Sequence, residues 1–125
     1  MDPVIKLSSL PHTWLIDIDG TIFEHNGHLS GVDKILPGVK QFWESIPASD
    51  VIILMTARSR EVADLTESAL DYYGLRFNQI IYGLPPGERI LVNDRKPSGL
   101  NCALALAVTR DAGMLGVRID IDPEL

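Results

Sequence analysis

Short apolar segments alternate with segments of helical periodicity along most of the chain. Apolar runs predict five buried strands, over residues 13–18, 51–55, 79–83, 89–93 and 114–120. Apolar residues recur at helical spacing over 39–46 and 60–73, and residues 100–108 are also predicted to form a helix. Strands without a polar face, alternating with helices, predict an α/β fold whose parallel sheet is covered on both faces.

Turn and capping residues mark where these elements begin and end. Pro37 precedes the helix over 39–46, and Ser59 is placed to cap the helix over 60–73, which Gly74 ends. The glycines of residues 27–38 predict a loop with a small hairpin. The second helix is expected to bury five side chains, those of Val62, Leu65, Ala69, Leu70 and Tyr73.

Polar residues directly follow three of the predicted strands. Asp17 and Asp19 end the first strand, Thr56 follows the second, and Asn93 and Asp94 follow the fourth. Ligands of parallel α/β sheets bind beyond the carboxyl ends of the strands. We therefore expect these groups, distant in sequence, to converge at one rim.

The convergence of carboxylates predicts phosphate chemistry with a divalent cation. Mg²⁺ is the usual partner of one or two carboxylates and a substrate phosphate, and Asp17 and Asp94 are the candidate side-chain ligands. Asp17 is the candidate nucleophile and Asp19 the candidate general acid and base. Gly20 is expected to turn the backbone and present its N–H to an anion, and residues 56–58 precede a helix N-terminus that favours phosphate.

Length and charge restrict the function classes. The 125 residues fit a single domain, residues 1–125. A net charge of −6 disfavours nonspecific binding of nucleic acid or of an anionic membrane. One cysteine excludes an internal disulfide, and neither a signal peptide nor an apolar run of membrane-spanning length is seen, so we expect a cytoplasmic protein.

Three segments resemble the motifs of the haloacid dehalogenase (HAD) superfamily of phosphohydrolases. DIDGT at 17–21, LMTAR at 54–58 and LVNDRKP at 91–97 are similar to its first, second and fourth motifs, and the resemblance spans residues 13–108. It implies a Rossmann-like three-layer sandwich around a mainly parallel five-stranded sheet. It also implies a phosphomonoester hydrolase that forms an aspartyl-phosphate.

By this resemblance, each motif supplies named site residues. Asp17 is the nucleophile and Asp19 the acid/base. Thr56, with Ala57 and Gly20, binds the phosphoryl oxygens. Mg²⁺ is held by the Asp17 side chain, the main-chain carbonyl of Asp19 and the Asp94 side chain.

The sequence departs from the HAD pattern at two places. Asn93 stands where a further acid is common, which removes one charge from the metal site. No lysine lies between Thr56 and Asp94, although the third motif usually supplies one. We expect Arg89, after the turn-forming residues 85–87, to replace it, with Lys96 as second choice.

The loops leave no room for a cap domain. Residues 20–37 allow only a short hairpin, and residues 83–89 only a tight turn. The chain therefore resembles capless HAD members, whose open sites take bulky substrates or are covered by a neighbouring subunit. A phosphorylated sugar is the expected substrate and a homo-oligomer a compatible state; a phosphoprotein or a nucleic-acid end is less favoured.

Two other functions stay open on the sequence alone. The chain could be a degenerate HAD module that binds a phospho-ligand without turnover, or a receiver-like module phosphorylated on aspartate. A receiver normally carries its acceptor after the third strand, whereas the key acid follows the first strand here. His25 and His28 are expected to be solvated loop residues rather than metal ligands, and Thr21 to bond within its own loop.

Overall fold

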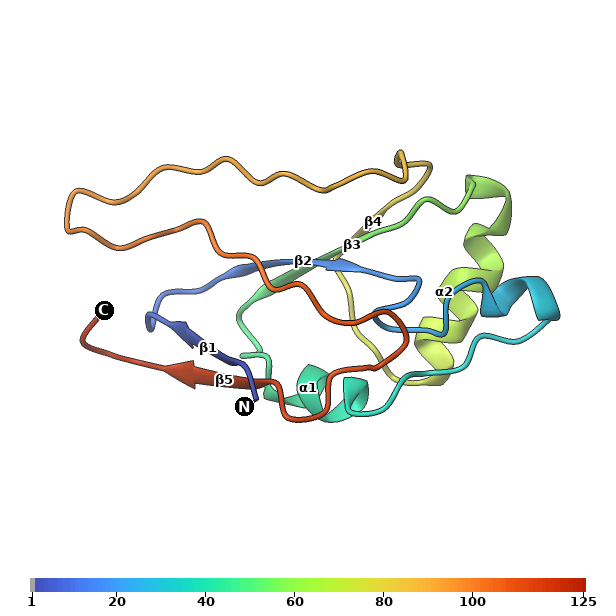
Figure 1. The fold of residues 1–125 in the computed structure, drawn as a ribbon, viewed down its shortest axis with the longest axis horizontal. Coiled ribbons are helices and arrows are strands. Elements are labelled where there is room, and N and C mark those ends of the chain that lie inside the picture. Colours follow the sequence, from blue (N-terminus) through green and yellow to red (C-terminus); the bar gives the residue numbers. More distant parts are fainter. Residues whose placement is uncertain (1) are drawn as a thin grey trace.

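The computed structural model describes residues 2–125 and has nine short elements (Figure 1). No helix within this part of the chain is long and apolar enough to cross a membrane. In chain order the elements are β1 Val4–Leu7, β2 Thr13–Asp17, the 3-10 helix η1 Gly27–Ser30, α1 Val39–Ser45, β3 Val51–Met55, the 3-10 helix η2 Arg60–Val62, α2 Ala63–Tyr72, β4 Gln79–Ile81 and β5 Arg118–Ile121.

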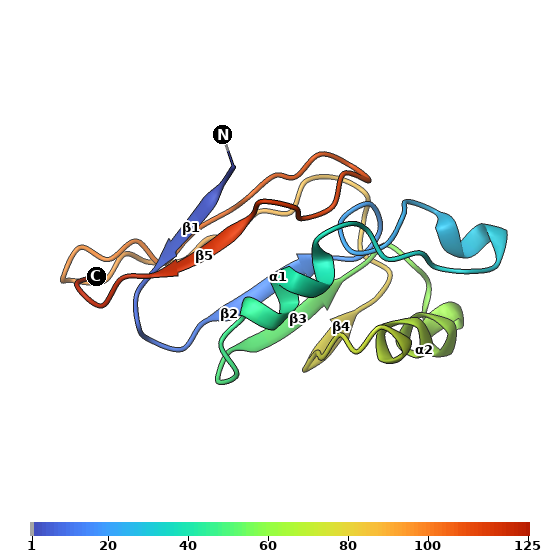
Figure 2. The same cartoon turned by 90° about the horizontal axis from the view of Figure 1, so that it is seen from below.

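The strands form two parallel sheets. β2, β3 and β4 lie side by side in that order, with Leu15 opposite Ile53 and Leu54 opposite Ile80. β1 pairs with β5 in a separate two-stranded sheet. Figures 1 and 2 both place this smaller sheet on the β2 side of the larger one, away from β4. The α/β class and the parallel strand direction are confirmed.

The core fills the space between the β2–β3–β4 sheet and its helices. Ile52 and Leu54 of β3 are fully buried, as is Leu70 of α2. Trp43 of α1 is nearly so, and its indole N–H donates to the Arg76 carbonyl at 2.9 Å. The strands predicted over 13–18, 51–55 and 79–83 and the helices predicted over 39–46 and 60–73 are all present, with ends shifted by a few residues.

Helix α2 buries most of the expected face, with Leu70 in the core and Ala69 and Tyr73 packed against it, but not Leu65. Leu65 is 44% exposed, whereas Thr66 beside it is fully buried. The Thr66 hydroxyl donates to the Val62 carbonyl at 2.8 Å and accepts from the Arg58 guanidinium at 3.0 Å. These polar partners satisfy the buried hydroxyl, so a polar residue displaces the leucine from the interior.

The strand predicted over 89–93 and the helix predicted over 100–108 do not form. Residues 84–112 instead make a long excursion that doubles back at a turn over 96–99, closed by the Lys96–Leu100 backbone bond and the Arg95–Asn101 bridge. Ile90 and Val92 are 85% and 89% exposed. An apolar run forms a strand only when it finds a ladder partner, and this run has none within the described residues.

The carboxyl-terminal strand is shorter than predicted, and one strand is unpredicted. A turn from Met114 to Val117 delays the start of β5 to Arg118. β1 gave no clear sequence signal but supplies the parallel partner of β5. The five strands therefore form two sheets of three and two, not the single five-stranded sheet that was expected, and β2 is an edge strand.

A buried carboxylate connects the start of β2 to the loop before β3. Asp50 Oδ2 accepts from His12 Nδ1 at 2.7 Å and from Trp14 Nε1 at 2.9 Å, and its Oδ1 accepts from the His12 backbone N–H at 3.0 Å. Burial alone would raise the pKa of Asp50, but the hydrogen bonds from Trp14 and His12 and the charge of His12 lower it below 3.8. This cluster lies at the amino ends of the strands, away from the rim.

We predict that Asp50→Asn lowers the free energy of unfolding by about 1–3 kcal/mol at pH 7, because a buried N–H loses its acceptor. A carboxyl with a lowered folded pKa stabilises above its unfolded pKa, and this stabilisation is lost as the pH falls through the folded pKa. The difference in free energy of unfolding between wild type and variant should therefore become smaller below about pH 4. Urea unfolding from pH 3 to 7 measures this difference, with exposed Asp71→Asn as control. A difference that does not change across this range contradicts the lowered pKa of Asp50.

Candidate active site

The carboxyl ends of β2, β3 and β4 meet at one rim, as predicted. Asp17 ends β2 opposite Met55, the last residue of β3. The Ile18 N–H donates to the Met55 carbonyl at 3.1 Å, and the Thr56 N–H donates to the Ile81 carbonyl at 3.0 Å. These bonds continue the sheet by one residue past β2 and β3. The side chains of Asp17, Asp19 and Thr56 are thereby brought to neighbouring positions.

A tight turn follows β2 and separates the two aspartates. The Ile18 carbonyl accepts from the N–H groups of Ile22 and Phe23 at 2.9 and 3.1 Å, and Gly20 adopts a φ of 84°. This left-handed conformation favours glycine, which explains the residue type. The Gly20 N–H donates to the Phe23 carbonyl at 2.7 Å. It is therefore not free to bind an anion, contrary to expectation.

Asp17 is the more accessible of the two acids. Its side chain is 36% exposed, and Arg89 Nη2 lies 3.8 Å from its Oδ1. Desolvation by burial raises the pKa of Asp17 above 3.8, and the Asp19 charge adds to this, while Arg89 and the Thr21 hydroxyl oppose it. The hydroxyl donates to Asp17 Oδ2 at 3.3 Å, which supports the local role expected for Thr21.

Asp19 is held by Arg58 through both carboxylate oxygens. Arg58 Nη2 donates to Oδ1 at 2.8 Å, and Nε lies 3.2 and 3.1 Å from Oδ1 and Oδ2. The Thr56 hydroxyl also donates to Oδ2, at 3.3 Å. The Asp19 side chain is only 16% exposed. The two acids of the motif thus occupy distinct environments.

Arg58 simultaneously binds a second carboxylate. Its Nη1 and Nη2 donate to Asp33 Oδ2 and Oδ1 at 3.0 and 2.7 Å, and Nη1 also donates to Thr66 Oγ1. With the bonds to Asp19, all five N–H donors of the guanidinium have partners. Burial alone would lower the Arg58 pKa, but its bonds and charge interactions with Asp33 and Asp19 raise it.

The histidines of the segment between β2 and α1 are less solvated than expected. His28 has a side-chain exposure of 13%, and its Nδ1 lies 3.8 Å from Asp19 Oδ1. The Nδ1 atoms of His25 and His28 are buried without a hydrogen-bond partner among the described residues. The His28 ring therefore lies beside Asp19, and the expectation that the two side chains are solvated is wrong at the Nδ1 atom of each.

The two phosphate-binding candidates in the loop after β3, Thr56 and Ala57, differ in their exposure. Thr56 is fully buried, and its Oγ1 accepts from the Arg58 backbone N–H at 3.0 Å while donating to Asp19. Ala57 is exposed at the rim. Of these two phosphate-binding candidates, only Ala57 is open to a ligand in this arrangement.

Among the candidate cations, Arg89 lies beside Asp17, the candidate nucleophile. Arg58 is fully committed to carboxylates, whereas Arg89 is 3.8 Å from Asp17 and a third exposed. Lys96 is exposed at the turn of the excursion, which both views place at the opposite end of the molecule from the carboxyl ends of β2 and β3 (Figures 1 and 2). The structure therefore favours Arg89 over Lys96.

Asp94 does not lie with the other candidate metal ligands. It is exposed, two residues before the turn at 96–99, within the excursion. Among residues 2–125, no group of three or more His, Cys, Asp or Glu side chains is placed to hold a metal ion. The rim itself offers hard oxygen donors in the Asp17 carboxylate and the main chain of Asp19, which suit Mg²⁺ with water completing its shell.

Residues 109–112 pack against the turn after β2, a contact that the sequence did not indicate. The Asp111 N–H donates to the Gly20 carbonyl at 2.9 Å, and Asp111 Oδ1 accepts from the His25 N–H at 2.7 Å. Arg110 runs alongside Gly20, where an added Cβ would lie 3.1 Å from Arg110 Cγ. The returning arm of the excursion thus covers the turn that carries Asp19.

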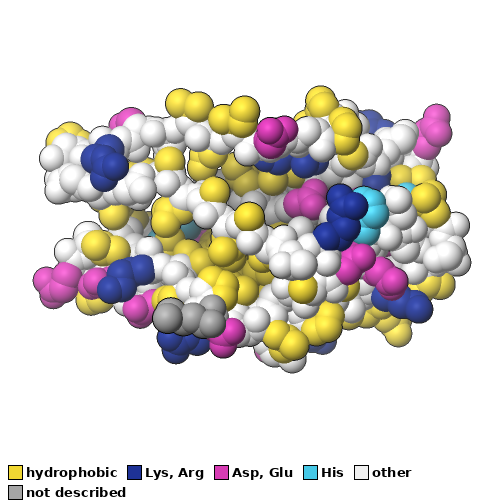
Figure 3. All heavy atoms as spheres, viewed as in Figure 1, with side chains coloured by type: hydrophobic (Ala, Val, Ile, Leu, Met, Phe, Trp, Pro, Cys, Tyr) yellow, Lys and Arg dark blue, Asp and Glu magenta, His cyan; other side chains and the backbone are white. Residues whose placement is uncertain are grey.

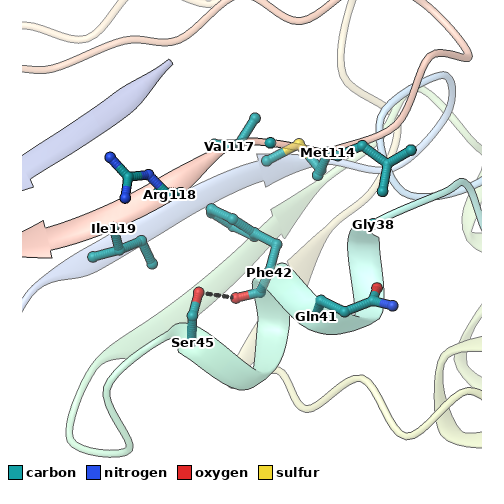
Figure 4. Close-up of a pocket in the computed structure, with 10 residues that line it drawn as sticks. Gly38, Gln41, Phe42, Ser45, Met114, Val117, Arg118 and Ile119 are labelled. Carbon is teal, nitrogen blue, oxygen red and sulfur yellow. Dashed lines mark hydrogen bonds between the residues drawn. The ribbon is translucent and has the colours of Figure 1, made fainter. Parts of the chain in front are cut away.

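Charged side chains and an apolar pocket occupy separate parts of the surface. Basic, acidic and histidine side chains gather over the carboxyl ends of β2 and β3 (Figure 3). An open pocket of ≈ 280 Å³ lies instead between α1 and the segment leading into β5 (Figure 4). None of the candidate catalytic residues lines that pocket, and Arg118 is its one charged lining residue among those described.

No known protein family, curated protein or solved structure matches this chain.

We predict that Asp17→Asn does not lower stability at neutral pH. A carboxyl whose folded pKa is raised stabilises only below its unfolded pKa, and this contribution is lost as the pH rises through the folded pKa. The variant should therefore be at least as stable as wild type at pH 7 and should lose this advantage toward pH 3. Thermal unfolding in EDTA tests this prediction; a variant that is clearly less stable at pH 7 contradicts the raised pKa of Asp17.

Proposed function

We propose that this protein is a Mg²⁺-dependent phosphomonoester hydrolase of the HAD type. The observation that carries the proposal is the pair Asp17 and Asp19 at the strand ends. Asp17 is accessible and beside Arg89, whereas Asp19 is fixed two residues later by a different arginine. Two carboxylates with distinct surroundings are what a nucleophile and an acid/base require.

In the proposed reaction, a carboxylate oxygen of Asp17 attacks phosphorus. The bond from phosphorus to the ester oxygen breaks, and protonated Asp19 gives its proton to that leaving oxygen. Water then attacks the phosphorus of the aspartyl-phosphate, and Asp19 takes a proton from this water. Inorganic phosphate leaves, and both carboxyl groups return to their starting states.

Arg89 and the metal would neutralise charge in this reaction. Arg89 Nη2, at 3.8 Å from Asp17, is placed to bind an oxygen of the incoming phosphoryl group. Mg²⁺ would be held by the Asp17 carboxylate and the Asp19 main-chain oxygen, with Asp94 as a further ligand if it reaches the rim. Bound there, the ion would polarise the phosphoryl oxygens.

A phosphorylated sugar is the proposed substrate class. The residues between β2 and α1 form only a short segment with one 3-10 turn, so no cap domain encloses the rim. An open site accommodates a bulky phosphorylated group, and a second copy of the chain could cover it. The net charge of −6 disfavours a nucleic-acid end.

A second candidate is a module that binds a phospho-ligand without turnover. One observation favours it: both oxygens of Asp19 accept N–H donors from Arg58. While both oxygens accept these bonds, neither is free to hold a proton for a leaving group, so proton transfer by Asp19 requires one of its bonds to Arg58 to open. Turnover, not ligand binding, separates the two candidates.

The deciding experiment is phosphate release from phosphorylated sugars, nucleotides and para-nitrophenyl phosphate, in Mg²⁺ and in EDTA. We expect Mg²⁺-dependent release that falls by at least about 10³-fold in Asp17→Asn, because the nucleophile is lost. Asp71→Asn is the matched control and should keep full activity. Turnover by folded Asp17→Asn would refute the nucleophile, and no release by wild type that still binds Mg²⁺ would favour the binding module.

Two parts of the proposal exclude each other and can be separated by mutation. In a parallel strand over residues 89–93, as in the five-stranded Rossmann-like sheet, Arg89 and Asp94 would lie about 16 Å apart. Asp94 at the rim therefore requires Arg89 to leave it. The structure has Arg89 beside Asp17, which supports the arrangement with Arg89 at the rim and Asp94 away from it.

We predict that Arg89→Gln lowers kcat/KM by about 10- to 100-fold, because a charge-assisted contact to phosphate is lost. Asp94→Asn should change it by less than about threefold if Arg89 stays beside Asp17. Steady-state kinetics over a range of Mg²⁺ concentrations measures both, with Lys96→Gln as control. The reverse pattern, a large loss only in Asp94→Asn, would instead support pairing of residues 89–93 with the free edge of β2.

A further inference from the structure

Arg58 connects the candidate acid/base to a carboxylate outside the recognised motifs. The guanidinium is 1% exposed, as is the side chain of Asp33, which follows η1 in the segment between β2 and α1. Its Nε and Nη2 donate to Asp19, and its Nη1 and Nη2 donate to Asp33. One buried cation is therefore shared by two carboxylates on different parts of the chain.

We propose that Arg58 and Asp33 are a positioning pair that holds the Asp19 carboxyl for proton transfer. The inference rests on the proposed phosphatase function and names residues that the sequence motifs do not assign to this role. Neither Arg58 nor Asp33 touches the reacting atoms; both act through Asp19.

The geometry explains why two partners are needed. Arg58 alone could rotate about its flexible side chain, but Asp33 binds both Nη atoms and fixes the plane of the guanidinium. Thr66 Oγ1 takes the remaining Nη1 donor at 3.0 Å, and the Tyr73 hydroxyl donates to the main-chain carbonyl of Asp33 at 3.0 Å. With its plane fixed, the guanidinium presents Nε and Nη2 to Asp19 in one orientation.

The charge balance gives Asp33 a second effect. Two carboxylates compete for one cation, so Asp33 takes part of the attraction that Arg58 would otherwise exert on Asp19. Loss of the Asp33 charge should leave Arg58 more mobile but bound to Asp19 alone. Both changes alter the position of the Asp19 carboxyl and the ease with which its bonds to Arg58 open. Neither change involves a contact with Asp17.

This proposal predicts a loss that depends on the leaving group. A sugar alkoxide needs a proton from Asp19 as it leaves, whereas para-nitrophenolate is stable enough to leave without one. A positioning pair for Asp19 therefore matters for a sugar phosphate more than for the aryl ester. A pair that only stabilises the fold would reduce the two rates alike.

The test compares Asp33→Asn and Arg58→Lys with wild type on the preferred sugar phosphate and on para-nitrophenyl phosphate. We expect kcat/KM, which reports formation of the aspartyl-phosphate, to fall about 10²-fold on the sugar phosphate and less than about threefold on the aryl ester. Hydrolysis of the aspartyl-phosphate also uses Asp19 and is common to both substrates, so kcat should fall on both. Arg58→Lys retains the charge but not the paired N–H groups, so it should not restore activity. Asp71→Asn serves as the surface control.

A second readout does not depend on activity and covers the case in which Arg58→Lys does not fold. Melting temperatures of Asp19→Asn, Asp33→Asn and the double variant should be non-additive, because both carboxylates act on the same guanidinium. Equal loss of kcat/KM on both substrates, or additive changes in melting temperature, would overturn the inference while leaving wild-type turnover intact. If the wild type shows no turnover but the melting temperatures of the variants are non-additive, the shared guanidinium is supported and the phosphatase function is refuted.

Discussion

The candidate site depends on one buried cation placed between two carboxylates. Arg58 enters the interior from the loop after β3 and there meets Asp19 from the turn after β2 and Asp33 from the following segment. A guanidinium with all five donors satisfied can be buried, whereas either carboxylate alone at that depth would be costly. The network thus connects the turn after β2, the loop after β3 and the segment before α1.

This network also gives the two aspartates of the DIDGT turn unlike surroundings. Asp17 is partly exposed, lies 3.8 Å from Arg89 and accepts from the Thr21 hydroxyl. Desolvation outweighs these two contacts and raises its pKa. Asp19 points inward and is bound on both oxygens. The difference comes from partners that folding brings near, because Arg58 and Thr56 bind Asp19 whereas Arg89 lies beside Asp17. Two aspartates separated by one residue thereby acquire different surroundings.

The observed structure departs most from the secondary structure predicted by the sequence in the excursion of residues 84–112. Its outgoing arm begins with Arg89 beside Asp17, and its returning arm ends with Asp111 bonded to Gly20. Both ends therefore take part in the rim, although Ile90 and Val92 between them are left exposed. The edge of β2 and these apolar residues stay unpaired with one another among the described residues, and Asp94 consequently lies away from the rim.

Local sequence determined the parts of the fold that need only neighbouring residues. Apolar runs produced β2, β3 and β4, helical spacing and Ser59 produced η2 and α2, and Gly20 marked the turn after Asp17. Long-range pairing decided the rest, because a strand requires a ladder partner and an ion pair requires a partner brought near by folding. For that reason the sequence pointed to Asp17, Asp19 and Arg89 as neighbours but not to Asp33, which only the tertiary structure places against Arg58.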